Sequence, residues 1–175
     1  DLLELINSQN PGLIRKFGGH AMAAGLTIGR QDFARFAHCF AETAAGQLQA
    51  EQLQGVIWSD GELESAELNS ANALLLRDAG PWGQGFAEPL FDGEFKLLEQ
   101  RLVGSNHLKL QLADASGQRF DAIAFNVDLQ LWPNPELNKV HVAYQLDLNS
   151  FRGITSLQLR ISRLWPAGQV PGLHR

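Results

Sequence analysis

The stretch HLKLQLADASGQRFDAIAF, residues 107–125, decides the fold of the second half of this chain. Leucines alternate with polar residues in its first part, and this period of two predicts a β-strand with Leu108, Leu110 and Leu112 on one face. The opposite face carries His107, Lys109 and Gln111. Residues 115–117 supply a turn, after which residues 120–125 return as the next strand. The stretch therefore predicts an antiparallel hairpin.

The same period of two recurs on both sides of this hairpin. Residues 91–103 precede it, and residues 140–149 and 157–162 follow it, which gives about five strands. A short helix or loop is expected at 126–132, between the third strand and the fourth. An antiparallel barrel of five strands with an insertion at that place is the plan of the OB-fold. One sheet of a β-sandwich that needs a partner sheet is the alternative, and the strand count favours the barrel.

The first half of the chain has a different pattern. Apolar residues recur at helical spacing, so we expect helices near residues 1–7, 32–53 and 65–79, and short strands at 26–28 and 55–58. In the third helix Leu68, Leu74 and Leu75 are expected to face inward. The glycine-rich run 80–86 ends this pattern. We therefore predict an α+β protein whose first part spans residues 1–84, followed by a barrel at 85–166 and a tail at 167–175.

Composition excludes several classes of protein. The chain has 175 residues, 45% of them hydrophobic, and a net charge of −5, which argues against a strongly basic nucleic-acid binder. The charge is uneven: residues 1–89 hold 5 Lys/Arg against 11 Asp/Glu, and residues 90–175 hold 9 against 8. No apolar run reaches the length of a membrane span, no signal peptide opens the chain, and the single cysteine, Cys39, fits a reducing compartment. We expect a cytoplasmic protein. Because the chain starts without methionine and partway into a helix, we also expect a piece of a longer protein.

The stretch FGGHAMAAG, residues 17–25, has two explanations. Glycines let backbone N–H groups approach an anion, a helix beginning after them would add its positive end, and His20 could donate a hydrogen bond to a phosphate. A turn with a closely packed helix behind it would need the same small residues. From the residues alone the second reading is favoured, since short glycine motifs match by chance.

Metal-binding and catalytic patterns are sparse. The five histidines have no ligand spacing with one another or with Cys39. Carboxylates alternate at Asp60, Glu62 and Glu64 and again at Asp92 and Glu94. Such carboxylates can hold Mg²⁺ or Mn²⁺, but a solvated acidic edge is favoured. No Ser/His/Asp or Cys/His constellation with a supporting context is present.

The surface of the predicted barrel offers a second kind of site. Basic residues interleaved with aromatic ones are typical of surfaces that hold single-stranded nucleic acid. The basic candidates are Arg101, His107, Lys109, Arg119, Arg152 and Arg160, and the stacking candidates are Trp82, Trp132 and Phe151. An ordinary charged exterior with buried aromatics explains the pattern equally well.

Several long segments, in order, resemble one family. They are FGGHAMAAGL (17–26), LLRDAGPWGQGFAEPLFDGEF (75–95), QRLVG (100–104) with HLKL (107–110), FDAIAFN (120–126), and AYQLDLNSFRG (143–153) with SLQL (156–159). Together they resemble the C-terminal part of the RecJ family, the bacterial single-strand-specific 5′→3′ DNA exonucleases among the DHH phosphoesterases. The resemblance runs from Asp1 to about Pro166.

The resemblance implies a division of labour. In that family two Mn²⁺ or Mg²⁺ ions are held by an N-terminal domain, and since no Asp-His-His run occurs here, the ligands would lie outside this chain and the fragment alone would be inactive. Residues 1–84 would be the C-terminal part of a DHH-associated α/β domain with connecting helices. Gly18, Gly19 and His20 match its Gly-Gly-His motif, which helps to hold the substrate phosphate. Phosphate contact then becomes the better reading of the stretch at 17–25.

The expected function is therefore to hold single-stranded DNA for an exonuclease of repair and recombination. The expected substrate-binding residues are Gly18, Gly19, His20, Arg101, His107, Lys109 and Arg152, with His20 as an auxiliary phosphate contact. The alternative is a protein-interaction module that docks the single-strand-binding protein or a repair helicase, which the acidic first half suits. A free-standing phosphoesterase is disfavoured, because no metal centre can be assembled from these residues.

Overall fold

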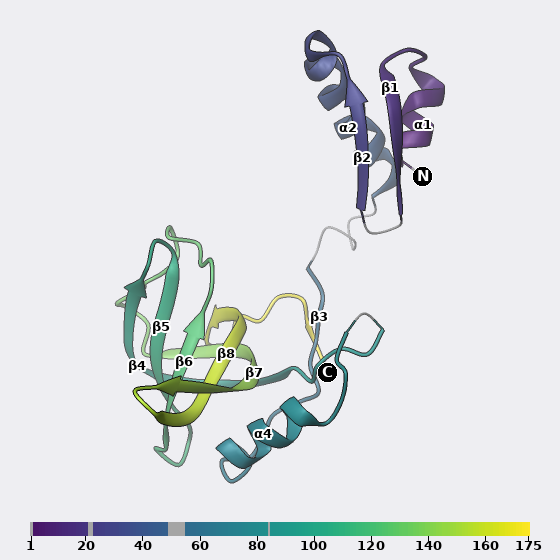
Figure 1. Ribbon diagram of the computed structural model, residues 1–175. Helices are drawn as coiled ribbons and strands as arrows, with labels where there is room; N and C mark the ends of the chain where they lie inside the picture. The colour runs from purple at the N-terminus through teal and green to yellow at the C-terminus, as the bar shows by residue number, and fades with distance from the viewer. Residues whose placement is uncertain (1, 21–22, 49–54, 84) are drawn as a thin grey trace. The chain divides into compact units, whose positions relative to one another are not determined.

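The computed structural model describes residues 2–20, 23–48, 55–83 and 85–175 (Figure 1). The chain divides into two compact units, Asp1–Gly55 and Val56–Arg175. This division falls earlier than the boundary expected between residues 84 and 85. The physical reason is burial, because Leu68 and Ala73 belong to the same hydrophobic core as the barrel strands. None of the described helices is long and apolar enough to cross a membrane.

The first unit contains two helices and a hairpin. Along the chain it consists of α1 (Leu2–Gln9), β1 (Ile14–His20), β2 (Ala23–Ile28), a 3₁₀ turn (Arg30–Asp32) and α2 (Phe33–Gln47). Its small core is built from Ile6, Leu13 and Ile14, against which Phe17 and Phe36 pack. The helix expected at the start of the chain and the strand expected at 26–28 are confirmed. The second helix ends earlier than expected, and residues 49–54 lie outside the described residues.

The helix expected behind the Gly-Gly-His stretch is wrong. Gly18, Gly19 and His20 lie on β1, and the small residues after them begin the antiparallel partner strand β2. Ala21 and Met22 lie outside the described residues. Small residues such as alanine and glycine are compatible with a closely packed helix and with a closely packed hairpin. The pairing of β1 with β2 determines that this stretch forms the hairpin. A Cβ atom on Gly19 would overlap the backbone of Ala23 and Ala24, which shows how closely the two strands approach.

The second unit is a closed barrel of five strands. These are β4 (Phe91–Val103), β5 (His107–Ala113), β6 (Arg119–Ala124), β7 (Lys139–Phe151) and β8 (Ile154–Pro166). They pair in the order β4-β5-β6-β8-β7, and β7 closes the barrel by pairing with β4. Only β6 and β8 run parallel among these pairs. The five-stranded OB-fold-like barrel is thus confirmed, and the β-sandwich alternative is wrong because the sheet closes on itself.

Alternation along each strand fills the barrel as the sequence predicts. The inward positions are buried, among them Leu108, Leu110, Leu112, Phe120, Val140, Val142, Tyr144, Leu146 and Leu159. Residues 126–138 form turns between β6 and β7, at the place where the insertion was expected. The outer face of β4, β5 and β6 is therefore left for polar side chains.

Residues before and after the barrel join the same unit. Helix α4 (Ser70–Asp78) packs on the barrel core through Ala73 and Leu76. Leu68, just before the helix, is buried in the same core as expected, whereas Leu74 and Leu75 are 43% and 65% exposed, so the inward position expected for these two is wrong. The helix begins late because Asn69 caps it, accepting a hydrogen bond of 2.8 Å from the backbone N–H of Asn72. The residues expected as a tail also belong here, since β9 (Leu173–His174) pairs with β3 (Ile57–Trp58).

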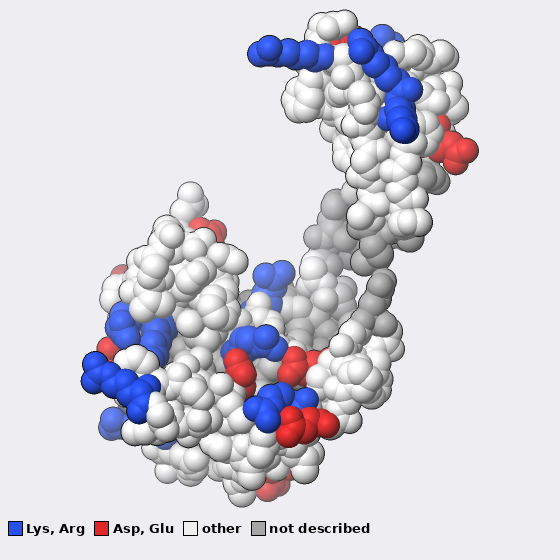
Figure 2. Space-filling model, in the orientation of Figure 1, with Lys and Arg blue, Asp and Glu red and all other residues white. Residues whose placement is uncertain are grey.

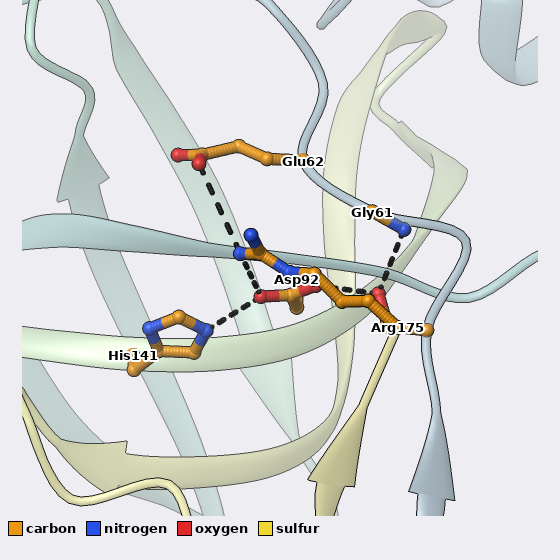
Figure 3. A network of polar contacts seen from close by, with 6 residues as sticks. Gly61, Glu62, Asp92, His141 and Arg175 are labelled. Atoms are coloured by element: carbon orange, nitrogen blue, oxygen red, sulfur yellow. Dashed lines mark hydrogen bonds and ion pairs between the residues drawn. The ribbon is translucent and has the colours of Figure 1, made fainter.

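A buried carboxylate ties these segments to the barrel (Figure 3). Asp92 on β4 is fully buried, which contradicts the expected solvated edge at this position. Ser59 Oγ donates to its Oδ1 at 2.5 Å, His141 Nε2 donates to its Oδ2 at 2.7 Å, and Arg175 donates to both oxygens at 3.0 and 2.7 Å. Burial alone would raise the pKa of Asp92, but the hydrogen bonds from Arg175, Ser59 and His141 lower it to about 2. We call these four residues the Asp92 node.

The Asp92 node is not a catalytic triad, although it contains Ser, His and Asp. In a triad the histidine contacts the serine hydroxyl and the carboxylate orients the histidine. Here Ser59 and His141 both contact the carboxylate of Asp92. These contacts join β4 to β7, to the segment that contains Ser59 and to the C-terminal Arg175, so their role is to hold the fold together.

Candidate nucleic-acid interface

Two cations lie side by side on the outer face of the barrel. Arg101 on β4 is directly opposite Lys109 on β5, and Lys109 is in turn opposite Ile123 on β6. Their neighbours Leu108 and Leu110 point into the core, so these positions point outward. Adjacent strands are about 4.8 Å apart, which brings the two side chains onto one patch of surface. In Figure 2, Lys and Arg side chains gather over the part of the barrel where Figure 1 places β4 and β5.

These cations are only weakly neutralised by the protein. A hollow of about 120 Å³ is lined by Glu99, Arg101, Lys109, Leu110, Gln111 and Asp121. Lys109 Nζ lies 3.9 Å from Asp121 Oδ2, and both side chains are partly exposed. Such a pair contributes little in water. Arg101 forms no ion pair with any residue that the structure describes. Both side chains can therefore turn to an external anion such as a phosphate.

His107 stands at the start of β5, two residues from Lys109 and on the same outer face. Its Nδ1 accepts a hydrogen bond of 3.2 Å from the backbone N–H of Asn126. An accepting Nδ1 means that the neutral ring carries its proton on Nε2, which is a suitable donor to a phosphate oxygen. The ring also packs edge-on against Phe125, with 5.1 Å between centroids. The structure thus brings three predicted residues, Arg101, His107 and Lys109, onto one face.

Arg152 lies apart from them, at the turn of the β7–β8 hairpin. Its backbone has φ +51° and Gly153 has φ +79°, so both turn residues are left-handed. The Arg152 guanidinium lies 5.1 Å from the centroid of the Phe151 ring, over its face. Phe151 is 66% exposed, as the predicted stacking role requires. The tip of this hairpin therefore offers an aromatic surface and a cation together.

Other candidates from the sequence are already engaged within the fold. Trp132 is 6% exposed and cannot stack on a base, so that expectation is wrong. Trp82 stacks on Phe86, and its indole N–H donates to the carbonyl of Leu76 at 2.9 Å. Arg160 donates to Glu88 Oε2 and to Gln145 Oε1, both at 2.8 Å. In each case the side chain makes tertiary contacts that the local sequence pattern does not predict.

The predicted phosphate contact belongs to the first unit. Gly18 pairs with Gly25 and His20 pairs with Ala23 across the β1–β2 hairpin, and all four residues are exposed. A Cβ on Gly18 or Gly25 would meet nothing within 4 Å, and neither residue has a positive φ. The fold therefore does not require glycine at either position. Their bare backbone leaves room for close approach of a ligand beside His20.

The metal centre that the family resemblance implies would have its ligands outside this chain, and the described residues do not form another one. No three of their His, Cys, Asp and Glu side chains lie together in an arrangement that would hold a metal ion. Glu62, Glu64 and Glu94 are exposed, and Asp92 is used by the Asp92 node. No catalytic step is therefore assigned to a metal within this part of the chain.

One exposed residue of the hairpin tip was not predicted from the sequence. Ile154, opposite Phe151 on β8, is 72% exposed. The turn signal at residues 149–153 pointed to the aromatic and the arginine but stopped one residue short. Pairing each residue before the Arg-Gly turn with its partner after it would have found Ile154.

Comparisons with known proteins found similar sequences over most of the chain. A family model described as the RecJ OB domain matches residues 59–163. The single-stranded-DNA-specific exonuclease RecJ of Dickeya dadantii is 53% identical over 167 residues, which covers 95% of this chain and 29% of that protein. The proteins of the same name from Haemophilus influenzae and Escherichia coli are 52% and 51% identical, again over 95% of this chain and 29% of each protein. The chain thus spans about 29% of the length of these relatives.

Solved structures agree in fold. RecJ of Thermus thermophilus in complex with Mg²⁺ superposes with a TM-score of 0.62 at 21% identity, covering 98% of this chain and 26% of that one. The Mn²⁺ complex from the same organism gives a TM-score of 0.58 at 24% identity, covering 91% of this chain and 23% of that one. At these identities the likeness concerns the fold.

Proposed function

The chain belongs to the RecJ family, and on that premise we propose that it is the DNA-binding C-terminal portion of a single-strand-specific 5′→3′ exonuclease. In this proposal the barrel holds the backbone of single-stranded DNA while a metal-dependent centre elsewhere in the longer protein hydrolyses it. The intact enzyme would act in DNA repair and recombination in the bacterial cytoplasm, with Mn²⁺ or Mg²⁺ as its cofactor.

The paired cations Arg101 and Lys109 carry the proposal. They lie opposite each other on an OB-type barrel, outside the core, beside Glu99 and Asp121. Among the described residues, the ion pair found for these two cations is the 3.9 Å contact of Lys109 with Asp121. In OB-folds the second and third strands and the loops beside them form the face that binds oligonucleotides. Here those strands are β5 and β6, so His107 and Lys109 lie on that face and Arg101 borders it.

The first unit would contribute a second phosphate contact. Gly18, Gly19 and His20 lie on an exposed hairpin, and the exposed Gly18–Gly25 pair has no structural need for glycine. We assign His20 the role of a positioned hydrogen-bond donor to the substrate phosphate in the longer enzyme. The ions that would bind the same phosphate need ligands from outside the described residues.

Fluorescence anisotropy of a labelled single-stranded oligonucleotide tests the proposal directly. The 175-residue chain is titrated at two salt concentrations, with duplex DNA for comparison. We expect binding that prefers the single strand and falls with added salt. The double substitution R101Q/K109Q should weaken binding and reduce the salt slope by roughly 1.4, about 0.7 for each lost phosphate contact.

Lys139→Gln is the control, and it is matched in charge to the single substitution K109Q. It removes one positive charge from a residue that already pairs with Glu94, away from Arg101 and Lys109 on the ladder that closes the barrel. Equal losses in the control and in the double variant, or no binding by the wild-type chain, would contradict the proposal.

Partner docking is the second candidate function, and one observation favours it. A pocket of about 200 Å³ is lined by residues of 124–132 and 161–164, and Phe125, Leu129 and Leu131 at this connection are 51%, 54% and 62% exposed. Exposed apolar side chains around a pocket are typical of protein interaction sites. The single-strand-binding protein and a repair helicase are the partners to test by titration calorimetry, with Leu131→Asp as the variant expected to abolish binding.

A further inference from the structure

The tip of the β7–β8 hairpin exposes two large apolar side chains that the core does not use. Phe151 is 66% exposed and Ile154 is 72% exposed. The two residues are directly opposite each other in the strand pairing, so their side chains lie on the same face of the hairpin. A continuous apolar surface is therefore presented to solvent at the end of two long strands.

This tip is a tight hairpin turn with a hydrogen bond across it. Arg152 and Gly153 form a two-residue turn in which both have positive φ, a geometry that matches the twist of the flanking strands. On the next pair below the turn, the hydroxyls of Ser150 and Thr155 lie 2.7 Å apart and hydrogen-bond across the hairpin. The apolar pair is thus preorganised, and a ligand that binds it has little chain ordering to bring about.

Arg152 adds a feature that folding does not explain. A left-handed backbone is unfavourable for a residue with a Cβ atom, and asparagine or glycine would suit this turn better. The one contact found for the side chain among the described residues is with the face of the Phe151 ring. Backbone strain that no stabilising contact in the fold offsets is commonly found at functional positions.

The hairpin tip lies on the same outward face as the cations of the barrel. Along β7 the outward positions alternate from Gln145 to Phe151, and Gln145 is opposite Arg160 on β8. Arg160 is opposite Ile123 on β6, whose other neighbour is Lys109. A strand of nucleic acid bound to Lys109 can therefore follow one surface to the tip.

We propose that Phe151 and Ile154 form a stacking clamp for an unpaired base, with Arg152 on the adjoining phosphate, and that this clamp makes the barrel select single strands. A flat apolar pair next to a cation complements a ligand with an aromatic face and a negative charge, which is the chemistry of a nucleotide. In a duplex the faces of the bases are already stacked on each other, so the clamp has nothing to hold. The inference rests on the proposed function and names residues that determine its specificity.

The test compares two probes with the same backbone. One is a single-stranded oligodeoxynucleotide, and the other is its fully abasic analogue of equal length, so that only the bases differ. The wild-type chain should bind the first more tightly, by about fivefold to about a hundredfold if one base stacks on the tip. F151A and I154A should lower this ratio towards one, while F151W should keep it.

Two further variants separate this inference from the proposed function. K109Q should weaken binding of both probes equally, because it removes a backbone contact. L75A removes an exposed apolar side chain of α4, which belongs to neither proposed binding surface, and should change neither probe. Since Phe151 and Ile154 are exposed, their variants should melt at the wild-type temperature.

The outcomes are distinct. If F151A and I154A keep the wild-type ratio while K109Q weakens binding, the clamp is refuted and the proposed function stands. If the wild-type chain binds neither probe, both are refuted. If the ratio falls but the preference over duplex DNA is unchanged, base stacking occurs there without setting specificity, and the claim of strand selection is overturned.

Discussion

Asp92 and Lys109 lie on paired strands of the same barrel, yet their charges have opposite surroundings. Asp92 is fully buried and accepts hydrogen bonds from three side chains. Lys109 is partly exposed, and its partner Asp121 is 3.9 Å away. A charge whose partners all come from the protein contributes to stability. A charge left nearly unpaired on the surface contributes little to the fold and is available to a ligand.

Removal of the buried carboxylate should have the largest effect. Asp92→Ala leaves Arg175, His141 and Ser59 without their common acceptor, and breaking a buried ion pair costs about 3–5 kcal/mol. We expect the free energy of unfolding, measured in urea, to fall by that order. Asp121→Ala, on the exposed pair, is the control and should change it by less than about 1 kcal/mol. Similar losses of unfolding free energy in the two variants would contradict the difference between the buried and the exposed carboxylate.

Acid should act on the same carboxylate. The pKa of Asp92 is lowered from 3.8 to about 2 in the folded protein, so the unfolded chain binds the proton more tightly. The stability from this group is therefore complete above about pH 4 and is lost as the pH falls towards about 2. Urea unfolding at several pH values should show this decline in the wild type. A variant without Asp92 should lack this part of the decline, provided it still folds.

His20 on β1 extends the comparison of buried and exposed polar groups to the first unit, since it is exposed. In the longer exonuclease that we propose, His20→Ala should lower the turnover number about tenfold to a hundredfold, because on that proposal it removes a hydrogen-bond donor to the charged phosphate. The melting temperature should stay the same. Turnover on a 5′-phosphorylated single strand provides the measurement, and unchanged kinetics would show that His20 is a surface residue without a role.

Gly18 and Gly19 give the sharpest contrast between a residue that the fold needs and one that it does not. Gly19→Ala puts a methyl group into the backbone of β2 and should destabilise the first unit by about 1–3 kcal/mol. Gly18→Ala meets open space and should leave stability nearly unchanged while lowering affinity for the substrate phosphate. Thermal melts of the two variants decide this, and equal melting temperatures would contradict the close strand pairing at Gly19.

The smallest expected effect is a gain in binding. Asp121→Asn removes the carboxylate 3.9 Å from Lys109 without changing its size. A weak surface pair contributes about 0.2–1 kcal/mol, so single-stranded DNA should bind up to about fivefold more tightly. Anisotropy at low salt measures this change. An unchanged or weaker affinity would mean that Lys109 does not contact the phosphate backbone.

Local patterns in the sequence predicted the barrel well, because each of its strands carries its own signal. Alternation at 107–112 and 140–146 identified both the strands and their buried faces, and the turn at 115–117 fixed the hairpin. The two-fold period is a property of the extended backbone, so no knowledge of neighbouring strands is needed to read it. The candidate cations on β4 and β5 followed from the same alternation.

Other features could not be read locally. The alanine- and glycine-rich stretch after Phe17 suits either helix or strand, and the pairing of β1 with β2 settled the matter. The same limitation affected Leu74 and Leu75, whose exposure depends on where α4 meets the barrel. Trp132 was an available aromatic in the sequence and a core residue in the structure.

By itself the sequence determined the class of fold, the order of the barrel strands along the chain and the outward position of Lys109, because these follow from backbone periodicity. Tertiary structure alone decided which charges remain available. Ser59, Asp92, His141 and Arg175 are far apart in sequence and meet only when the barrel closes and β9 pairs with β3. Arg101 and Lys109 become neighbours only through the register of β4 and β5. Polar groups find their partners in three dimensions, and those that the fold pairs only weakly, such as Lys109, form the candidate binding surface.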